Sequence, residues 1–264
     1  MGAEDRWRRE QAYHDAEAAA RARTFAGEPD RLRFNDDDYL NHEPWVRRAM
    51  DRLGPVAGRR VLDWGCGHGM AAVVLARRGA IVTACDLSSG YVREAQARAA
   101  ANGAGIDCLQ ANGERLPIAD AAFDAVWGHA ILHHLDVPRA AAELRRVLRP
   151  DGVAVLCEPW NGNPLLRLAR EWRWTGRHTV DEAPLDAAAL RKVRAAFPAL
   201  EVDGVQLFSM LARSHRPSGW QSFLARSDAR ILERWPALQR LARYVVLVLR
   251  PGGPGLSRVF GAVP

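Results

Sequence analysis

Short apolar runs alternate with amphipathic segments through the middle of the chain, between residues 59 and 160. The runs with the length and composition of buried strands are 59–65, 80–88, 106–112, 123–129 and 152–159. Apolar residues recur at helical spacing in three segments between them, 70–79, 91–103 and 138–150. Strands separated by helices of roughly 10 to 15 residues predict right-handed crossovers and a parallel sheet.

The segments on either side of this region have a different pattern. The first fifty residues predict helices over 5–25 and 45–53, with capping residues at 35–38. Beyond residue 160 the chain predicts an irregular or helical segment to 177, a helix over 183–198, and strands over 200–211 and 243–251. We therefore expect a helical region at 1–57 and one domain at 58–264, with insertions at about 160–182 and 211–243.

The composition fits one globular domain with appendages. Of the 264 residues, 48% are hydrophobic and 26% are charged, so a core can form. The longest apolar runs, 71–76 and 244–249, are far shorter than the roughly 20 residues that cross a bilayer. The charged N-terminus has no apolar signal segment, and the four cysteines stand apart without a zinc or disulfide pattern. We expect a soluble, cytoplasmic protein.

The net charge of +6 raises the question of a nucleic-acid partner. Lys192 is the only lysine among the 37 basic residues, and no block of five like charges occurs. Arginine and alanine in place of lysine are what a GC-rich coding sequence produces, so the arginines need not contact phosphates. We expect no nucleic-acid partner.

A glycine-rich loop joins the first predicted strand to the helix that follows it. The loop carries Asp63 two residues before Gly65, and then Gly67 and Gly69, which allow a tight turn and close backbone approach to a ligand. Asp86 ends the next strand, where an acid can accept both hydroxyls of a ribose. A dinucleotide site would need a glycine at position 70, and Asp63 would repel a diphosphate. The pattern favours a cationic nucleoside.

The segments 61–69, 84–88, 111–138 and 146–159 resemble, in this order, the motifs of class I S-adenosylmethionine-dependent methyltransferases of the small-molecule type. The resemblance implies an α/β fold with a Rossmann-like, seven-stranded, mostly parallel sheet and helices on both faces. It also implies S-adenosyl-L-methionine as cofactor, S-adenosyl-L-homocysteine as product, and an N-terminal helical lid carrying Tyr13 over the cofactor.

The same resemblance implies the residues that would contact the cofactor. The methionine half would lie against the glycine loop, formed by Asp63, Trp64, Gly65, Cys66, Gly67 and Gly69. The ribose and adenine would lie against Asp86, Leu87, Asn112, Gly113 and Glu114. At position 112 the family usually has an acid, and an asparagine can still offer its amide oxygen to the adenine amine.

Three histidines follow the fourth strand, at the expected mouth of the site: His129, His133 and His134. An imidazole can take a proton near neutral pH, so His133 and His134 are the candidate catalytic residues. Adjacent residues on a helix point about 100° apart, so only one of them can face the substrate. The family pattern has a histidine at position 134 that packs near the cofactor, as we also expect for His129. His129 and His133 lack a third ligand nearby, so we expect no metal.

The methyl acceptor is expected to be a small, lipophilic molecule of secondary metabolism, with O-methylation favoured over N- or C-methylation. No tetrad like Asn-Pro-Pro-Tyr follows the fourth strand, which argues against amide or base N-methylation. Both insertions mix arginines with aromatic and aliphatic residues. Such a mixture fits weak peripheral membrane contact, or more usually a helix that packs its apolar side on the sheet. The alternative functions are a nicotinamide-dependent reductase and a non-catalytic nucleoside-binding module.

Overall fold

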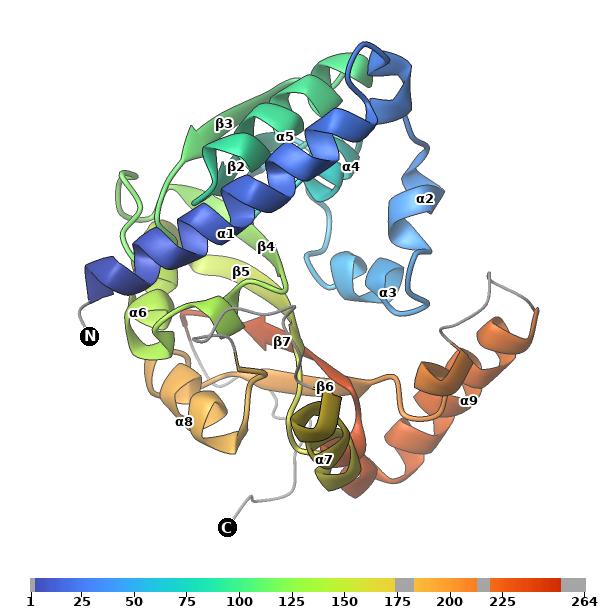
Figure 1. Ribbon diagram of the computed structural model, residues 1–264. Coiled ribbons are helices and arrows are strands. Elements are labelled where there is room, and N and C mark those ends of the chain that lie inside the picture. Colours follow the sequence, from blue (N-terminus) through green and yellow to red (C-terminus); the bar gives the residue numbers. More distant parts are fainter. Residues whose placement is uncertain (1–2, 174–182, 213–218, 253–264) are drawn as a thin grey trace.

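A single seven-stranded sheet forms the centre of the computed structural model, which describes residues 3–173, 183–212 and 219–252 (Figure 1). The strand order is β3-β2-β1-β4-β5-β7-β6. The strands are β1 Arg60–Trp64, β2 Ile81–Asp86, β3 Ile106–Gln110, β4 Phe123–His129, β5 Leu148–Pro159, β6 Glu201–Val205 and β7 Tyr244–Leu249.

Helices cover both faces of this sheet. The α-helices are α1 Ala3–Thr24, α2 Asp36–Leu40, α3 Val46–Asp51, α4 Met70–Arg77, α5 Ser89–Ala101, α6 Val137–Val147, α7 Pro164–Arg173, α8 Ala187–Ala196 and α9 Gly219–Arg234. Short 3-10 helices are η1 Pro29–Leu32, η2 Leu132–His134, η3 Ser209–Ala212 and η4 Pro236–Leu241. The core therefore has two layers, one between the sheet and α2 to α5, the other between the sheet and α6 and α8.

The strands β1 to β5 run parallel, as the alternation of strands and helices predicts, and β7 lies antiparallel between β5 and β6. All but the first residue of β7 are buried, which explains its continuous apolar sequence. The expected seven-stranded, mostly parallel fold is confirmed.

The predicted sixth strand, 200–211, is too long. β6 ends at Val205, and Gln206 has a left-handed backbone with φ of 62°. The buried carboxylate of Asp228 then accepts the backbone N–H groups of Leu207, Phe208 and Ser209, at 2.9–3.0 Å. These bonds turn the chain into η3, so a residue of α9 ends the strand.

Two other boundaries differ from the sequence prediction. The helix expected at 138–150 gives way to β5 at Leu148, and α2 was not predicted. A capping box between Asn35 and Asp38 starts α2. Within the two insertions α7 and α9 are helical, while 174–182 and 213–218 lie outside the described residues.

The first helix, α1, lies along α5 (Figure 1) and is held mainly by polar contacts. Asp15 accepts hydrogen bonds from Ser88 Oγ at 2.6 Å and from the backbone N–H of Gly90 at 3.1 Å. Farther along the helix, Arg21 pairs with Glu94 at 2.8 Å. Since few apolar side chains of α1 are buried, the helix can separate from α5 more easily than a core helix can.

Candidate active site

The three glycines of the loop after β1 all have left-handed backbones but serve different purposes. A Cβ at Gly65 would lie 2.6 Å from the side chain of Ile131, and a Cβ at Gly69 would lie 2.7 Å from the Cα of Ala95. A Cβ at Gly67, whose φ is +48°, would meet nothing within 4 Å. Gly65 and Gly69 therefore permit close packing, while Gly67 presents bare backbone to an open space.

Asp86 at the end of β2 holds this loop in place. Its carboxylate accepts the backbone N–H groups of Gly67 and Ser88, both at 2.9 Å. Burial raises the pKa of Asp86, and these two hydrogen bonds counteract part of that rise. A carboxylate has about four lone-pair sites, so acceptor capacity remains for ligand hydroxyls.

Asp63 lies behind the glycine loop and is 2% exposed. Burial raises its pKa to about 7; a backbone hydrogen bond at Ala72 opposes the rise and the charge of Asp86 adds to it. Its Oδ2 atom is buried without a hydrogen-bond partner. A positively charged group in this part of the site would stabilise the ionised form of Asp63.

A cavity of about 200 Å³ opens beside Gly67 and Asp86. Several buried polar atoms of its lining residues have no hydrogen-bond partner, namely Nε1 of Trp7 and Trp64, and Nδ1 of His68 and His134. Buried polar atoms are normally hydrogen-bonded. A polar, cationic nucleoside such as S-adenosylmethionine fits these atoms, the bare Gly67 backbone and the Asp86 carboxylate, with the buried Asp63 behind the loop.

Only some of the residues expected at the cofactor line this cavity. Those that do are Trp64, Gly65, Gly67, Asp86, Leu87, Asn112, Gly113, His129 and His134. Those that do not are Tyr13, Asp63, Cys66, Gly69 and Glu114. On α1, His14 lines the cavity and its neighbour Tyr13 does not.

The amide oxygen of Asn112 accepts the backbone N–H of Glu114 at 2.8 Å, and keeps a second lone pair. Glu114 itself is buried. It pairs with Arg6 of α1 and accepts the backbone N–H of Asp136. Glu114 therefore links α1 to the segment that follows η2.

The two adjacent histidines have different surroundings. His134 lines the cavity, and its Nδ1 is 3.2 Å from Oε2 of Glu10. His133 is buried, with Nδ1 2.7 Å from the carboxylate of Glu158. His133 therefore does not face solvent. Burial and the nearby His42 lower the pKa of His129 to about 4, so His129 is neutral at physiological pH.

Glu158, at the end of β5, was not foreseen and organises the loop after β4. It has no exposed surface. Besides His133, it accepts the backbone N–H groups of Ile131 at 3.0 Å and Leu132 at 2.8 Å. Because Ile131 and His134 line the cavity, this buried carboxylate shapes the wall of the site.

Four cavity-lining residues of α1 were also missed: Trp7, Glu10, His14 and Glu17. Their spacing of three, four and three residues places them on one helix face, which is a signal the sequence does contain. The same face carries the electrostatic contacts of His14. Burial lowers the pKa of His14, but Glu10, Asp86 and Glu17 together raise it above the ordinary value.

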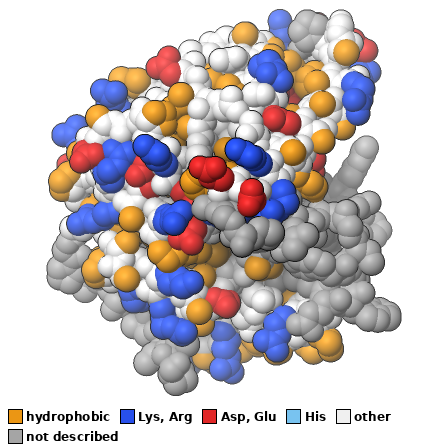
Figure 2. All heavy atoms as spheres, turned by 60° about the vertical axis from the view of Figure 1, so that its left-hand side comes forward, with side chains coloured by type: hydrophobic (Ala, Val, Ile, Leu, Met, Phe, Trp, Pro, Cys, Tyr) orange, Lys and Arg blue, Asp and Glu red, His pale blue; other side chains and the backbone are white. Residues whose placement is uncertain are grey.

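The surface on the side that carries α1 has basic and acidic side chains interspersed, without a continuous basic area (Figure 2). In the part of the chain that the structure describes, no helix combines the length and the apolar character needed to span a bilayer.

Comparison with known proteins relates the central part of the chain to a described family. Residues 62–156 match the family model for a methyltransferase domain. The demethylmenaquinone methyltransferase of Thermobifida fusca (strain YX) is 37% identical over 134 residues, which are 49% of this chain and 56% of that protein. The malonyl-[acyl-carrier protein] O-methyltransferase of Enterobacter lignolyticus (strain SCF1) is 35% identical over 151 residues, 55% of this chain and 56% of that protein.

The chain thus spans about half the length of the curated relatives it matches. Among solved structures, an S-adenosylmethionine-dependent methyltransferase from Mesorhizobium loti superposes with a TM-score of 0.53 and 21% identity, over 80% of this chain and 99% of that one. At this identity the likeness concerns the fold.

Proposed function

We propose that this protein is a class I S-adenosylmethionine-dependent methyltransferase that methylates a small, lipophilic metabolite, with oxygen as the favoured acceptor atom. The match of residues 62–156 to the methyltransferase-domain family model supports this proposal. The observation that carries the proposal is the bare Gly67 backbone held by Asp86 beside a cavity with unsatisfied polar atoms. The experiment that tests it is release of S-adenosylhomocysteine from S-adenosylmethionine, in the presence of a panel of phenols, hydroxyquinones and carboxylic acids. No release with any of these acceptors counts against it.

The residues present would hold the cofactor in two halves. Asp86 would accept the ribose hydroxyls, the Gly67 backbone would face the methionine half with Asp63 buried behind the loop, and Asn112 would lie near the adenine. When bound, the cofactor supplies the methyl group and a sulfide leaving group. The protein contributes alignment, exclusion of water and, for a hydroxyl acceptor, a base.

Helix α1 acts as the lid in this proposal. The cavity beneath it is smaller than the roughly 300–1,000 Å³ of ordinary ligand sites, so α1 must move for the cofactor to enter. Trp7, Glu10 and His14 would then close over the bound cofactor. The polar attachment of α1 to α5 suits such a movement.

A lipophilic acceptor is supported by apolar side chains outside the shared domain. The exposed large hydrophobic residues include Leu165 and Leu168 on α7, which are 75% and 64% exposed, and Phe208, Phe223 and Trp235 near or on α9. An amphipathic helix usually buries its apolar side against its own domain. Here α7 and α9 leave apolar side chains exposed, which could contact a lipophilic acceptor. A reductase is disfavoured because α4 begins with Met70 where a dinucleotide site needs glycine.

We expect Asp86→Asn to weaken S-adenosylhomocysteine binding by about 10- to 100-fold, which corresponds to roughly 1.5–3 kcal/mol. The amide has one oxygen in place of two, so either the loop N–H groups or a ribose hydroxyl loses its acceptor. Calorimetric titration measures the effect, with Asp107→Asn on β3 as the matched control. An unchanged affinity in folded Asp86→Asn protein would contradict the ribose assignment.

Alanine variants of His133 and His134 should differ in their effects on cofactor affinity and on turnover. We expect His134→Ala to weaken cofactor binding, because His134 lines the cavity. His133 does not line the cavity, so we expect His133→Ala to leave that affinity within about threefold. If its imidazole is nevertheless the base, turnover should fall by 10²–10⁴-fold, the usual contribution of a positioned base. Glu158 holds Nδ1 of His133, so proton exchange with the acceptor would use Nε2. Turnover by His133→Ala close to that of the parent would mean that no base is needed.

A further inference from the structure

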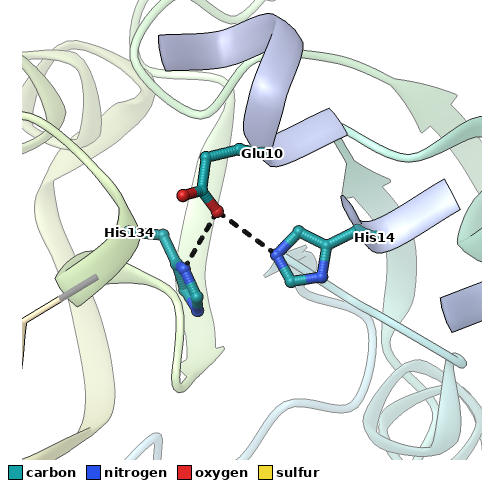
Figure 3. Close-up of side chains that lie close together, drawn as sticks. All are labelled: Glu10, His14 and His134. Atoms are coloured by element: carbon teal, nitrogen blue, oxygen red, sulfur yellow. Dashed lines mark ion pairs between the residues drawn. The ribbon is translucent and has the colours of Figure 1, made fainter. Parts of the chain in front are cut away.

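We propose that Glu10, His14 and His134 form a binding site for a divalent transition-metal ion of the Zn²⁺ type, which ties α1 to the loop after β4. Figure 3 shows the three side chains converging from two elements, with Glu10 and His14 on α1 and His134 opposite them. A carboxylate with two imidazoles is a ligand set that zinc uses in proteins.

The two ligand-atom distances that involve Glu10 are close to those around one tetrahedral ion. Oε2 of Glu10 is 3.2 Å from Nδ1 of His134 and 3.6 Å from Nε2 of His14. Zinc bonds of about 2.0–2.2 Å at tetrahedral angles place neighbouring ligand atoms roughly 3.3–3.6 Å apart. One ligand atom from each residue lies within 4.8 Å of the other two, so a small adjustment of the rings completes the set.

The contact between His134 and Glu10 is an ion pair only when the imidazole is protonated, and no hydrogen bond joins Nδ1 to Oε2 (Figure 3). Nδ1 of His134 is buried and lies close to the carboxylate, yet it has no hydrogen-bond partner. With a neutral imidazole, a cation between the two atoms would give Nδ1 of His134 a partner at this separation, because Nδ1 and Oε2 of Glu10 would then each direct a lone pair at the same ion.

The surroundings of the cluster favour a cation. Glu10 is 3% exposed, and both histidines are partly buried. Two further carboxylates lie nearby: Oε2 of Glu17 is 3.3 Å from Nδ1 of His14, and Asp86 lines the same cavity. This negative field would draw a divalent ion into the cluster.

Metal and cofactor should exclude each other, a consequence that rests on the function proposed above. All three ligands line the cavity beside Asp86. An ion there holds α1 in the closed position seen here, whereas the cofactor requires α1 to move. Bound metal would therefore keep the empty enzyme closed and lower its apparent affinity for the cofactor.

The first test uses Zn²⁺ alone, with tag-free full-length protein, so its outcome is independent of the proposed function. We expect calorimetry to give one ion per chain, and Co²⁺ to show the visible absorption of a four-coordinate site. Glu10→Gln and His134→Ala should each weaken binding by more than about 100-fold, since loss of a mere supporting partner costs roughly 10–100-fold. Glu10→Gln keeps the shape of the side chain, so it serves if His134→Ala fails to fold.

The matched control is His42→Ala, because His42 is an exposed histidine outside the cluster. It should bind Zn²⁺ as the parent does. No stoichiometric binding by the parent, or equal binding by parent and Glu10→Gln, would overturn the site. In a second titration, saturating S-adenosylhomocysteine should weaken Zn²⁺ binding at least tenfold. Simultaneous undiminished binding would overturn the mutual exclusion, and failure of S-adenosylhomocysteine to bind metal-free protein would count against the proposed function instead.

Discussion

Gly67→Val is expected to weaken S-adenosylhomocysteine binding by more than about 100-fold, equivalent to at least roughly 2.7 kcal/mol, while the chain stays folded. A side chain at this position meets no protein atom within 4 Å, so it projects into the open space that the cofactor would use. The φ of +48° adds a backbone cost of about 1–2 kcal/mol for a residue with a Cβ, which a folded domain can tolerate. Calorimetric titration and urea unfolding measure the two effects separately.

Gly103→Val is the matched control for this change. Gly103 also has a left-handed backbone, with φ of +62°, and a Cβ there also meets nothing within 4 Å. It follows α5 and does not line the cavity. The control should therefore lose similar stability and keep its cofactor affinity. Equal affinities for the two variants would contradict the assignment of the Gly67 loop to the cofactor.

The second large effect concerns stability. Glu158→Ala should lower the free energy of unfolding by about 3 kcal/mol, because it leaves the N–H groups of Ile131 and Leu132 and the ring of His133 without their acceptor. The loop that carries Ile131 and His134 should loosen, so cofactor affinity should fall as well. Urea unfolding measures the first effect and calorimetry the second.

Glu28→Ala provides the comparison, since Glu28 is exposed and pairs only at the surface with Arg31. A surface pair of this kind contributes about 0–1 kcal/mol. Glu158→Gln keeps one oxygen acceptor, so its loss of unfolding free energy should lie between those of Glu158→Ala and Glu28→Ala. If Glu158→Ala costs no more than Glu28→Ala, the buried carboxylate does not hold the loop.

The sequence alone determined the order of strands and helices from β1 to β5, and the place of the glycine loop. Both depend on short-range patterns. Apolar residues repeat with the period of a strand or helix, and glycines at 65, 67 and 69 stand directly between a strand and a helix. Asp86 was found for the same reason, because its position at the end of the next strand follows from the repeat.

Where the prediction failed, side chains distant in sequence decide the structure. β6 ends at Val205 because Asp228, more than twenty residues later, accepts the N–H groups of the following turn. The pattern of apolar and polar residues in 200–211 does not predict that contact. In the same way Glu158 separates the surroundings of His133 from those of His134, although the two residues are neighbours in the chain.

Which side of α1 faces the site was likewise a matter of tertiary structure. The stripe of Trp7, Glu10, His14 and Glu17 is visible in the sequence, but a mostly polar helix has no apolar face to show which side is buried. Its rotation is set by contacts with residues more than seventy positions away, such as Asp15 with Ser88 and Arg6 with Glu114. Local pattern therefore determined the order of elements from β1 to β5 and the position of the glycine loop, whereas long-range polar contacts decided which side chains of α1 line the cavity.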